Sequence, residues 1–208
     1  MNDKIVYSDI YKAAWKGLIS QIWLLTGLLI GFSIIYSLLL LFAFPTKGES
    51  VSISGFIVLF ISLLFGGLFM MGYLRNCLQS IDGEEPQFSA YGQVSAKLPS
   101  FLIACIIYLV ITSIGFAFFI FPGIYLCLRL QFFLASMVDE DAGMITSFKR
   151  SWNITKGQVF QLFAMMLIQL LMFFAGLIAL FIGIFVAIPH ITMLYGITFR
   201  KLIAPDEQ

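Results

Sequence analysis

Few side chains in this sequence have the chemistry for catalysis. His190 is the only histidine, and no Ser/His/Asp set, HExxH motif or glycine-rich phosphate loop accompanies it. The cysteines at positions 77, 105 and 127 lie in or beside apolar segments without metal-ligand spacing, so we expect them to pack as small hydrophobic side chains. The sequence therefore predicts no catalytic residue, no metal site and no cofactor. We expect His190 to be an interfacial residue after Pro189.

Three consecutive acids form the one carboxylate cluster that we weigh as a metal site: Asp139, Glu140 and Asp141. Hard divalent cations prefer clustered oxygen ligands, so a metal is one interpretation. Adjacent carboxylates at a helix start rarely converge on one point, and acids there stabilise the helix dipole. We therefore expect the acids to open an amphipathic helix that runs from Asp141 to Lys156, with Gly157 closing it.

Arg129 has the strongest claim to a binding role. It stands about halfway along the apolar segment 122–138, and an arginine at the centre of a membrane helix costs roughly 2.5 to 3.5 kcal/mol. No carboxylate lies within a predicted span, so its candidate partners are Gln131, Gln169, backbone carbonyls at broken helices, water or an anionic ligand. Two hypotheses stay open, a structural hub bonded to carbonyls and a site for a polar or anionic ligand.

Composition assigns the chain to the integral membrane proteins. Hydrophobic residues make up 61% of the chain and charged residues 11%, whereas soluble proteins average about 25% charged. Mean hydropathy is +1.00. The formal net charge of +1 provides no bulk attraction to nucleic acid, so we expect no nucleic-acid partner.

The apolar runs predict an all-α, polytopic fold of about six transmembrane helices. A crossing needs about 20 residues, and the predicted spans cover 18–44, 51–74, 100–121, 124–138, 158–188 and 191–199. Apolar residues at helical spacing predict amphipathic interfacial helices at 8–18, at 88–98 and from 141 to 156. The last two spans could instead form a re-entrant hairpin.

The order of these segments suggests an internal repeat. Each third reads as an interfacial helix, an outward span, a proline turn and a return span, with turns at Pro45, Pro122 and Pro189. We therefore treat residues 1–208 as a single membrane domain built from three hairpins, with approximate boundaries at 1–76, 77–140 and 141–204.

The basic residues predict the orientation. Ten of the 12 Lys and Arg side chains fall on one side of the six-span arrangement, Lys47 falls on the other side, and Arg129 lies within a span. Basic loops stay in the cytoplasm, so both termini and the interfacial helices are predicted to be cytoplasmic. With no cleavable signal peptide apparent, the expected location is a bacterial inner membrane.

Three runs carry a resemblance to a known family: GYLRNCLQSIDGEEPQFSAYGQ, FPGIYLCLRLQFFLASMVDEDAG and SFKRSWNITKG. They resemble the membrane-domain family associated with bacterial glycerophosphodiester phosphodiesterases and related stand-alone membrane proteins, over roughly residues 72–202. The most specific positions are Pro122, Gly123, Arg129, Asp139, Glu140, Ser151, Trp152, Thr155 and Gly157. The resemblance implies a bundle of about six helices. In that family the module can precede a soluble phosphodiesterase domain, which these 208 residues do not contain, so we expect no such activity.

Three functions remain as hypotheses, and we favour the first. It is a non-catalytic membrane module that binds lipid or a partner protein of the membrane or envelope and that helps to organise the membrane or an envelope complex. Its lipid-facing candidates are Trp15, Lys149, Arg150 and Lys156. The second is a small transporter or channel with a polar path near Arg129. The third is a membrane-embedded lipid enzyme. The sequence identifies no specific lipid and leaves the oligomeric state open.

Overall fold

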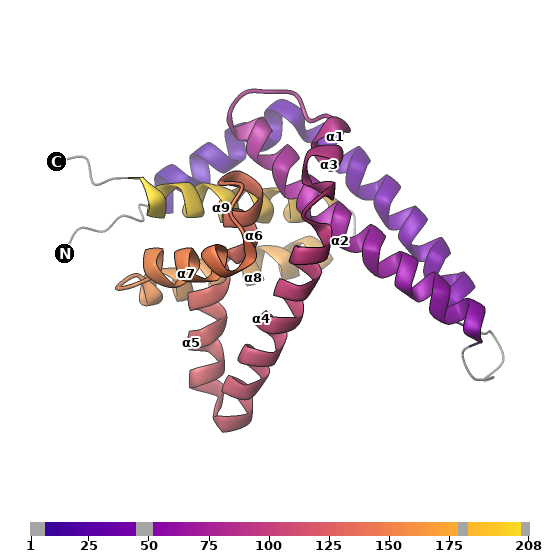
Figure 1. Ribbon diagram of the computed structural model, residues 1–208. Helices are drawn as coiled ribbons and strands as arrows, with labels where there is room; N and C mark the ends of the chain where they lie inside the picture. The colour runs from indigo at the N-terminus through magenta and orange to yellow at the C-terminus, as the bar shows by residue number, and fades with distance from the viewer. Residues whose placement is uncertain (1–6, 45–51, 179–182, 205–208) are drawn as a thin grey trace.

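The computed structural model describes residues 7–44, 52–178 and 183–204. Every regular element in these ranges is a helix (Figure 1), so the predicted all-α fold is confirmed. In chain order the helices are α1 (Tyr7–Ala43), α2 (Ile53–Ile81), α3 (Ser89–Ser95), α4 (Leu98–Phe118), α5 (Ile120–Leu130), α6 (Phe133–Asp139), α7 (Met144–Ile154), α8 (Val159–Ile178) and α9 (Ile184–Ile203).

Five helical segments in the described ranges are long and apolar enough to cross a membrane. They are α1, α2, α4, the α5–α6 segment from Ile120 to Asp139, and α8. The sixth predicted span, 191–199, is wrong as a separate element, because these residues form the middle of α9. Helix α9 is not among the candidate spans, since it contains Pro189, His190, Arg200 and Lys201 and buries half of its residues in the protein.

Helix α1 combines the first predicted interfacial helix with the first span. The backbone at Gln21 leaves helical geometry (φ −132°, ψ 22°), which bends the helix between the two parts. Just before the bend, the Ser20 hydroxyl donates to the Gly17 carbonyl at 2.7 Å. The part before Gln21 packs against α9, where a Cβ on Gly17 would lie 3.4 Å from the Met193 sulfur. The bend therefore separates the packed first part of α1 from the second part, which pairs with α2 (Figure 1).

The proline turn predicted at Pro189 is wrong, because Pro189 lies inside α9. A proline within a helix has no N–H to donate to the carbonyl four residues earlier. That carbonyl belongs to Phe185, and the Thr26 hydroxyl of α1 donates to it at 3.3 Å. The end of α8 meets the start of α9 earlier in the chain, where a Cβ on Gly176 would lie 2.9 Å from the Gly183 carbonyl oxygen. The turn predicted at Pro45 lies outside the described residues.

The Pro122–Gly123 turn is also displaced. The chain reverses at Phe119, whose backbone is extended (φ −169°, ψ 160°), and Pro122 lies in the first turn of α5. Proline is tolerated there because the first N–H groups of a helix have no partner within it. A Cβ on Gly123 would lie 2.4 Å from the Phe116 ring, so glycine at this position lets α4 and α5 pack closely. The interfacial helix predicted at 88–98 is shorter in the structure, because α3 ends at Ser95 and Pro99 lies in the first turn of α4.

The fourth predicted span, 124–138, is broken into two helices. Helix α5 ends at Leu130 and α6 begins at Phe133, with Gln131 and Phe132 between them. Asp139 ends α6, and α7 begins at Met144 with Gly143 as its N-cap. The three acids therefore lie at the end of α6 and just after it. The expectation that they open α7 is wrong. Arg129 lies in the last turn of α5, next to the break, and is thus about halfway along the Ile120–Asp139 segment, as the sequence predicted.

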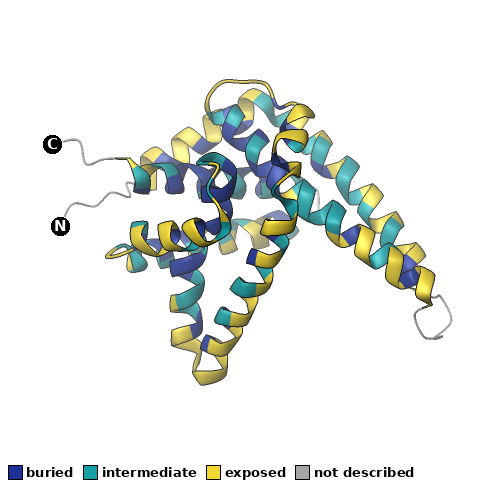
Figure 2. Cartoon of the chain, viewed as in Figure 1, coloured by how far each residue is buried: buried dark blue, intermediate teal, exposed yellow. Residues whose placement is uncertain are grey.

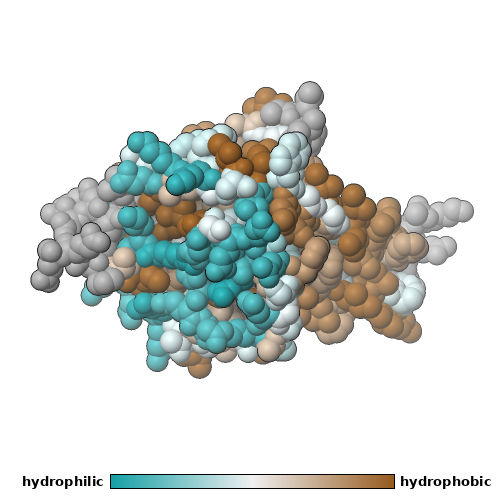
Figure 3. Space-filling view, turned by 90° about the horizontal axis from the view of Figure 1, so that it is seen from above, coloured by the Kyte–Doolittle hydropathy of each residue, from teal (hydrophilic) through white to brown (hydrophobic). Residues whose placement is uncertain are grey.

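The buried centre of the molecule lies where α2, α6 and α9 meet. Residues 132–138 are all buried, and Figure 2 shows burial concentrated at this junction. The α1–α2 pair and the α4–α5 pair extend away from it in different directions (Figure 1), with exposed apolar side chains along them. Hydrophilic side chains gather on one face of the molecule, and hydrophobic ones cover the α1–α2 end (Figure 3).

Candidate functional site

The break between α5 and α6 is held together by a hydroxyl from α7. The Ser151 hydroxyl donates to the Arg129 carbonyl at 2.8 Å and accepts from the Phe132 amide at 3.1 Å. A broken helix leaves such groups without helical partners, and a buried unpaired group costs about 1 to 3 kcal/mol. Thr155, one turn later, lies 3.2 Å from the same carbonyl and 2.7 Å from the Ser151 carbonyl. Two motif residues therefore complete the backbone hydrogen bonding of the break.

A tyrosine from α9, Tyr195, also completes backbone hydrogen bonds at the break. The Tyr195 hydroxyl donates to the Gln131 carbonyl at 2.7 Å and accepts from the Ala135 amide at 3.3 Å. Its ring stacks on Phe132, with centroids 5.1 Å apart. Nothing about Tyr195 in the sequence marked it for this role, because the break itself has no proline or glycine signal.

The side chain of Arg129 lies against aromatic rings. It is 3% exposed, and its guanidinium carbon lies 4.2 Å from the centroid of the Trp152 ring and 5.8 Å from that of Tyr125. A cation over an indole face is attracted by the ring's negative potential. Within the described residues the guanidinium forms no ion pair, and its Nε has no hydrogen-bond partner. The structural-hub hypothesis therefore fits the backbone carbonyl of Arg129, which accepts hydrogen bonds from α7. The guanidinium charge is stabilised by the Trp152 ring instead.

Gln131 and Gln169, the other two hub candidates, lie together but do not bond to Arg129. They line a cavity of about 10 Å³ with Phe132, Leu162, Met165, Tyr195 and Thr198. A cavity of this volume holds at most one water molecule. The two glutamines thus adjoin the break on its Tyr195 side.

Each of the three consecutive acids pairs with a cation from a different part of the chain. Asp139 binds Arg200 of α9 at 2.8 Å, Glu140 binds Arg150 of α7 at 2.7 Å, and Asp141 pairs with Lys97, which precedes α4. The Lys97 ammonium holds the pKa of the exposed Asp141 carboxyl below its ordinary value. Because the carboxylates diverge, they do not share a cation site, and no group of three potential ligands for a metal occurs in the described residues.

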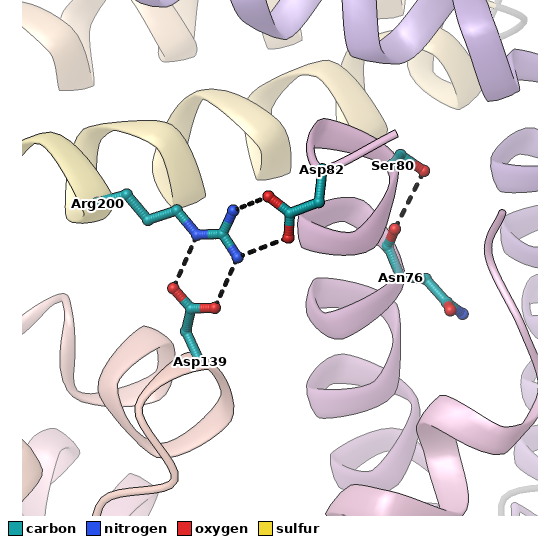
Figure 4. Close-up of polar contacts among 5 residues, drawn as sticks. All are labelled: Asn76, Ser80, Asp82, Asp139 and Arg200. Carbon is teal, nitrogen blue, oxygen red and sulfur yellow. Dashed lines mark hydrogen bonds and ion pairs between the residues drawn. The ribbon is translucent and has the colours of Figure 1, made fainter. Parts of the chain in front are cut away.

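Arg200 joins three helix ends (Figure 4). Its Nε and Nη2 donate to the two Asp139 carboxylate oxygens at 2.8 Å each, and its Nη1 and Nη2 donate to Asp82 at 2.5 and 3.0 Å. These hydrogen bonds to Asp139 and Asp82 raise the pKa of Arg200 further. The planar fork of arginine suits two bidentate carboxylates. The ends of α2, α6 and α9 are therefore fixed relative to one another.

Comparison with known proteins places relatives in mycobacteria. The chain is 26% identical over 148 residues to Uncharacterized protein Rv2560 of Mycobacterium tuberculosis and, at the same identity and length, to Uncharacterized protein Mb2590 of Mycobacterium bovis. The matches cover 71% of this chain, and it spans only about 44% of the length of each relative. No protein-family model and no solved structure matches the chain. The relatives are bacterial, and their names state no activity.

The predicted lipid-facing residues divide into two groups. Arg150 is paired with Glu140, and Trp152, although 40% exposed, lies under Arg129. Trp15 is 44% exposed, and Lys149 and Lys156 are exposed.

Gly157 adopts positive φ (+81°), which lets the chain turn from α7 into α8.

Arginines and lysines have different roles in this fold. Arg75 donates to the Val138 carbonyl at 3.3 Å, and Arg150 and Arg200 bind acids. In contrast, five lysines are exposed and form no ion pair with any described residue: Lys12, Lys16, Lys149, Lys156 and Lys201. These arginines and Lys97, which pairs with Asp141, thus contribute to internal structure, whereas the five exposed lysines form no such pair in the described residues.

The sequence predicted His190 at an outer turn after Pro189, and this prediction is wrong. It is 1% exposed, and the Tyr11 and Trp15 rings of α1 lie edge-on to it at centroid distances of 5.0 and 5.4 Å. Burial lowers the pKa of its imidazole, and neither ring nitrogen has a hydrogen-bond partner in the described part of the chain. His190 is therefore a neutral packing residue between α9 and α1.

Proposed function

We propose that this protein is a non-catalytic membrane module that binds anionic lipids through lysines beside its apolar helices. The proposed location is a bacterial inner membrane, with both termini and the amphipathic helices on the cytoplasmic side. In this proposal α8 and α9 form a re-entrant hairpin that enters and leaves the membrane from that side, since α9 is not itself a candidate span. The lysine distribution supports this orientation, because basic loops are retained in the cytoplasm. In this role the protein helps to organise the membrane or an envelope complex.

The unpaired lysines are the observation that carries the proposal. The Tyr7 hydroxyl donates to the Gln161 carbonyl at 3.4 Å, so the first turn of α1 lies beside the start of α8. Lys12 and Lys16 follow in α1, and Lys156 comes shortly before α8. Lysines near a membrane surface attract anionic headgroups by about 1 kcal/mol each. Cations and apolar helix surface are thus close together, as a lipid-binding surface requires.

Transport has less support. The cavity next to the predicted polar residues is about 10 Å³, too small for a solute, and the Arg129 side chain is packed against Trp152. A lipid enzyme has less support again, since His190 is packed between rings and the acids at 139–141 are paired with cations. The resemblance to the phosphodiesterase-associated membrane domain is compatible with a non-catalytic module.

Lipid retention tests the proposal. The protein is purified from bilayers that contain equal amounts of phosphatidylglycerol and phosphatidylcholine, and the lipids that remain bound are counted by native mass spectrometry. We expect phosphatidylglycerol to be enriched, and changing Lys12, Lys16, Lys149 and Lys156 to Gln to remove the enrichment. Changing the same four residues to Arg preserves the charge and is the control. Equal retention of the two lipids by the wild-type protein would refute the proposal.

A further inference from the structure

A groove runs along the first part of α1 where it meets α8 and α9. One section, of about 290 Å³, is lined by Ser8, Tyr11 and Lys12 of α1 and by Met165, Ile168 and Leu194 below them. The adjoining section, of about 360 Å³, is lined by Tyr11, Lys12, Trp15, Lys16 and Ile19. Tyr11 and Lys12 line both sections, so the two adjoin at these residues, and we call them together the α1 groove.

The two sides of the α1 groove differ in chemistry. Lys12 and Lys16 are four residues apart, so both ammonium groups lie on one face of the helix. No carboxylate lines either section, and the nearest acid in sequence, Asp9, accepts a hydrogen bond from Ser8 at 3.1 Å. Met165, Ile168 and Leu194 form an apolar floor. The groove therefore offers two cations beside a hydrocarbon surface.

The apolar floor opens onto a surface of α8 that faces outward. Ile168 is 37% exposed, and Leu171, one turn further along the same helix, is 69% exposed. A ligand that lies in the groove can therefore extend along α8 into the hydrocarbon. Free phosphate would contact the lysines but would leave this floor uncovered.

Packing behind the groove holds its aromatic side in place. Tyr11 and Trp15 are nearly parallel, with centroids 6.5 Å apart and an interplanar angle of 4°. The buried His190 contacts both rings from α9. Preformed sites lose less conformational entropy when a ligand binds.

We infer that the α1 groove binds one anionic phospholipid, with its phosphate at Lys12 and Lys16 and an acyl chain along Met165, Ile168 and Leu194. This inference rests on the proposed lipid-binding function and assigns it to a single site. Positive charge on one side and hydrocarbon on the other complement the two parts of such a lipid.

Two pairs of matched variants test the charged and apolar sides separately. The double variant K12Q/K16Q is expected to lower retention of phosphatidylglycerol about tenfold or more, because each lysine near an anionic headgroup contributes roughly fivefold. The matched variant K149Q/K156Q removes the same charge outside the α1 groove and should lower retention by a smaller factor than K12Q/K16Q does. Ile168→Trp should fill the floor and lower retention with all lysines present, whereas Leu171→Trp, outside the groove, should not.

The outcomes separate this inference from the broader function. If the wild-type protein retains phosphatidylglycerol and phosphatidylcholine equally, both fail. If it prefers phosphatidylglycerol but K149Q/K156Q loses as much as K12Q/K16Q, or Ile168→Trp has no effect, only the α1 groove is refuted. Phosphatidylglycerol with brominated acyl chains provides a second readout. It should quench Trp15 fluorescence more than brominated phosphatidylcholine does, in protein with Trp23 and Trp152 changed to Phe, and equal quenching would also refute the site.

Discussion

The hydroxyl of Ser151 donates to the carbonyl of Arg129 at 2.8 Å across 22 residues of sequence. Through this bond α7 stabilises the end of α5, because the same hydroxyl also accepts from the Phe132 amide beyond the break. The serine of the SWNITKG run is thus a structural residue of the α5–α6 break.

Ser151→Ala should destabilise the protein by about 1 to 3 kcal/mol, because it leaves a buried carbonyl and a buried amide without a partner. Thermal unfolding in detergent measures the loss. Asn153→Ala, an exposed position on the same helix, is the control and should change stability little. Equal losses in the two variants would contradict the role given to the Ser151 hydroxyl.

Arg200→Gln should lower stability by about 1 to 3 kcal/mol, since it leaves Asp139 with an unpaired charge in a largely buried position. The side chain of Asp139 is 12% exposed and that of Asp82 is 47% exposed, so the coupling energy with Asp139 should be the larger one. Double-mutant cycles with Asp139→Asn and Asp82→Asn measure both couplings. Lys201→Gln, next in the chain and unpaired in the described structure, should be nearly neutral. A larger coupling with Asp82 would show that burial does not decide the strength of these pairs.

Trp152→Leu should cost about 0.5 to 2 kcal/mol of cation–π attraction to Arg129, and Trp152→Phe should cost less because a smaller aromatic face remains. To isolate this attraction, the loss of stability caused by Trp152→Leu is measured in the wild-type protein and again in the Arg129→Leu variant. Urea denaturation or thermal unfolding reports both. If Trp152→Leu costs the same in the two backgrounds, the ring does not stabilise the charge.

His190 should make stability depend on pH. Burial lowers its pKa, so the folded protein binds a proton less readily than the unfolded chain does. Stability is therefore complete above the ordinary histidine pKa of about 6.5 and falls as pH decreases through that value toward the pKa in the folded state. The melting temperature of the wild-type protein should drop between about pH 7.5 and about pH 5.5 by more than that of His190→Leu. Parallel pH profiles would show that His190 is not responsible.

Labelling of single cysteines tests the proposed orientation. In protein with Cys77, Cys105 and Cys127 changed to Ala, cysteines at Glu84 and Lys149 should react from the cytoplasmic side. A cysteine at Phe119, which is 76% exposed at the α4–α5 reversal, should react from the opposite side. Impermeant maleimide added to intact cells and to inverted vesicles distinguishes the two. Labelling of Glu84 and Phe119 from the same side would overturn the arrangement.

The sequence alone determined the class of the protein and most of its helices. Uninterrupted apolar runs about as long as a bilayer crossing leave few alternatives to membrane helices, because unsatisfied backbone groups are too costly in hydrocarbon. The amphipathic spacing of residues 144–152 likewise predicted α7, although its start is three residues later than Asp141. The motif around Arg129, Ser151, Trp152 and Thr155 was also recognised, but the sequence did not show that these residues meet.

Only the tertiary structure decided how breaks and charges are satisfied. No proline or glycine marks the break at Gln131–Phe132 in the sequence. The backbone groups that it frees bind Ser151 and Tyr195, which belong to helices distant in sequence. Pro189 stays within a helix because Thr26 donates to the carbonyl that the proline leaves free. Asp82 and Arg200 are 118 residues apart in sequence, and their pairing depends on where α2 and α9 end. Local sequence sets the periodicity of a helix, whereas packing between helices decides which distant group completes its hydrogen bonds and balances its charge.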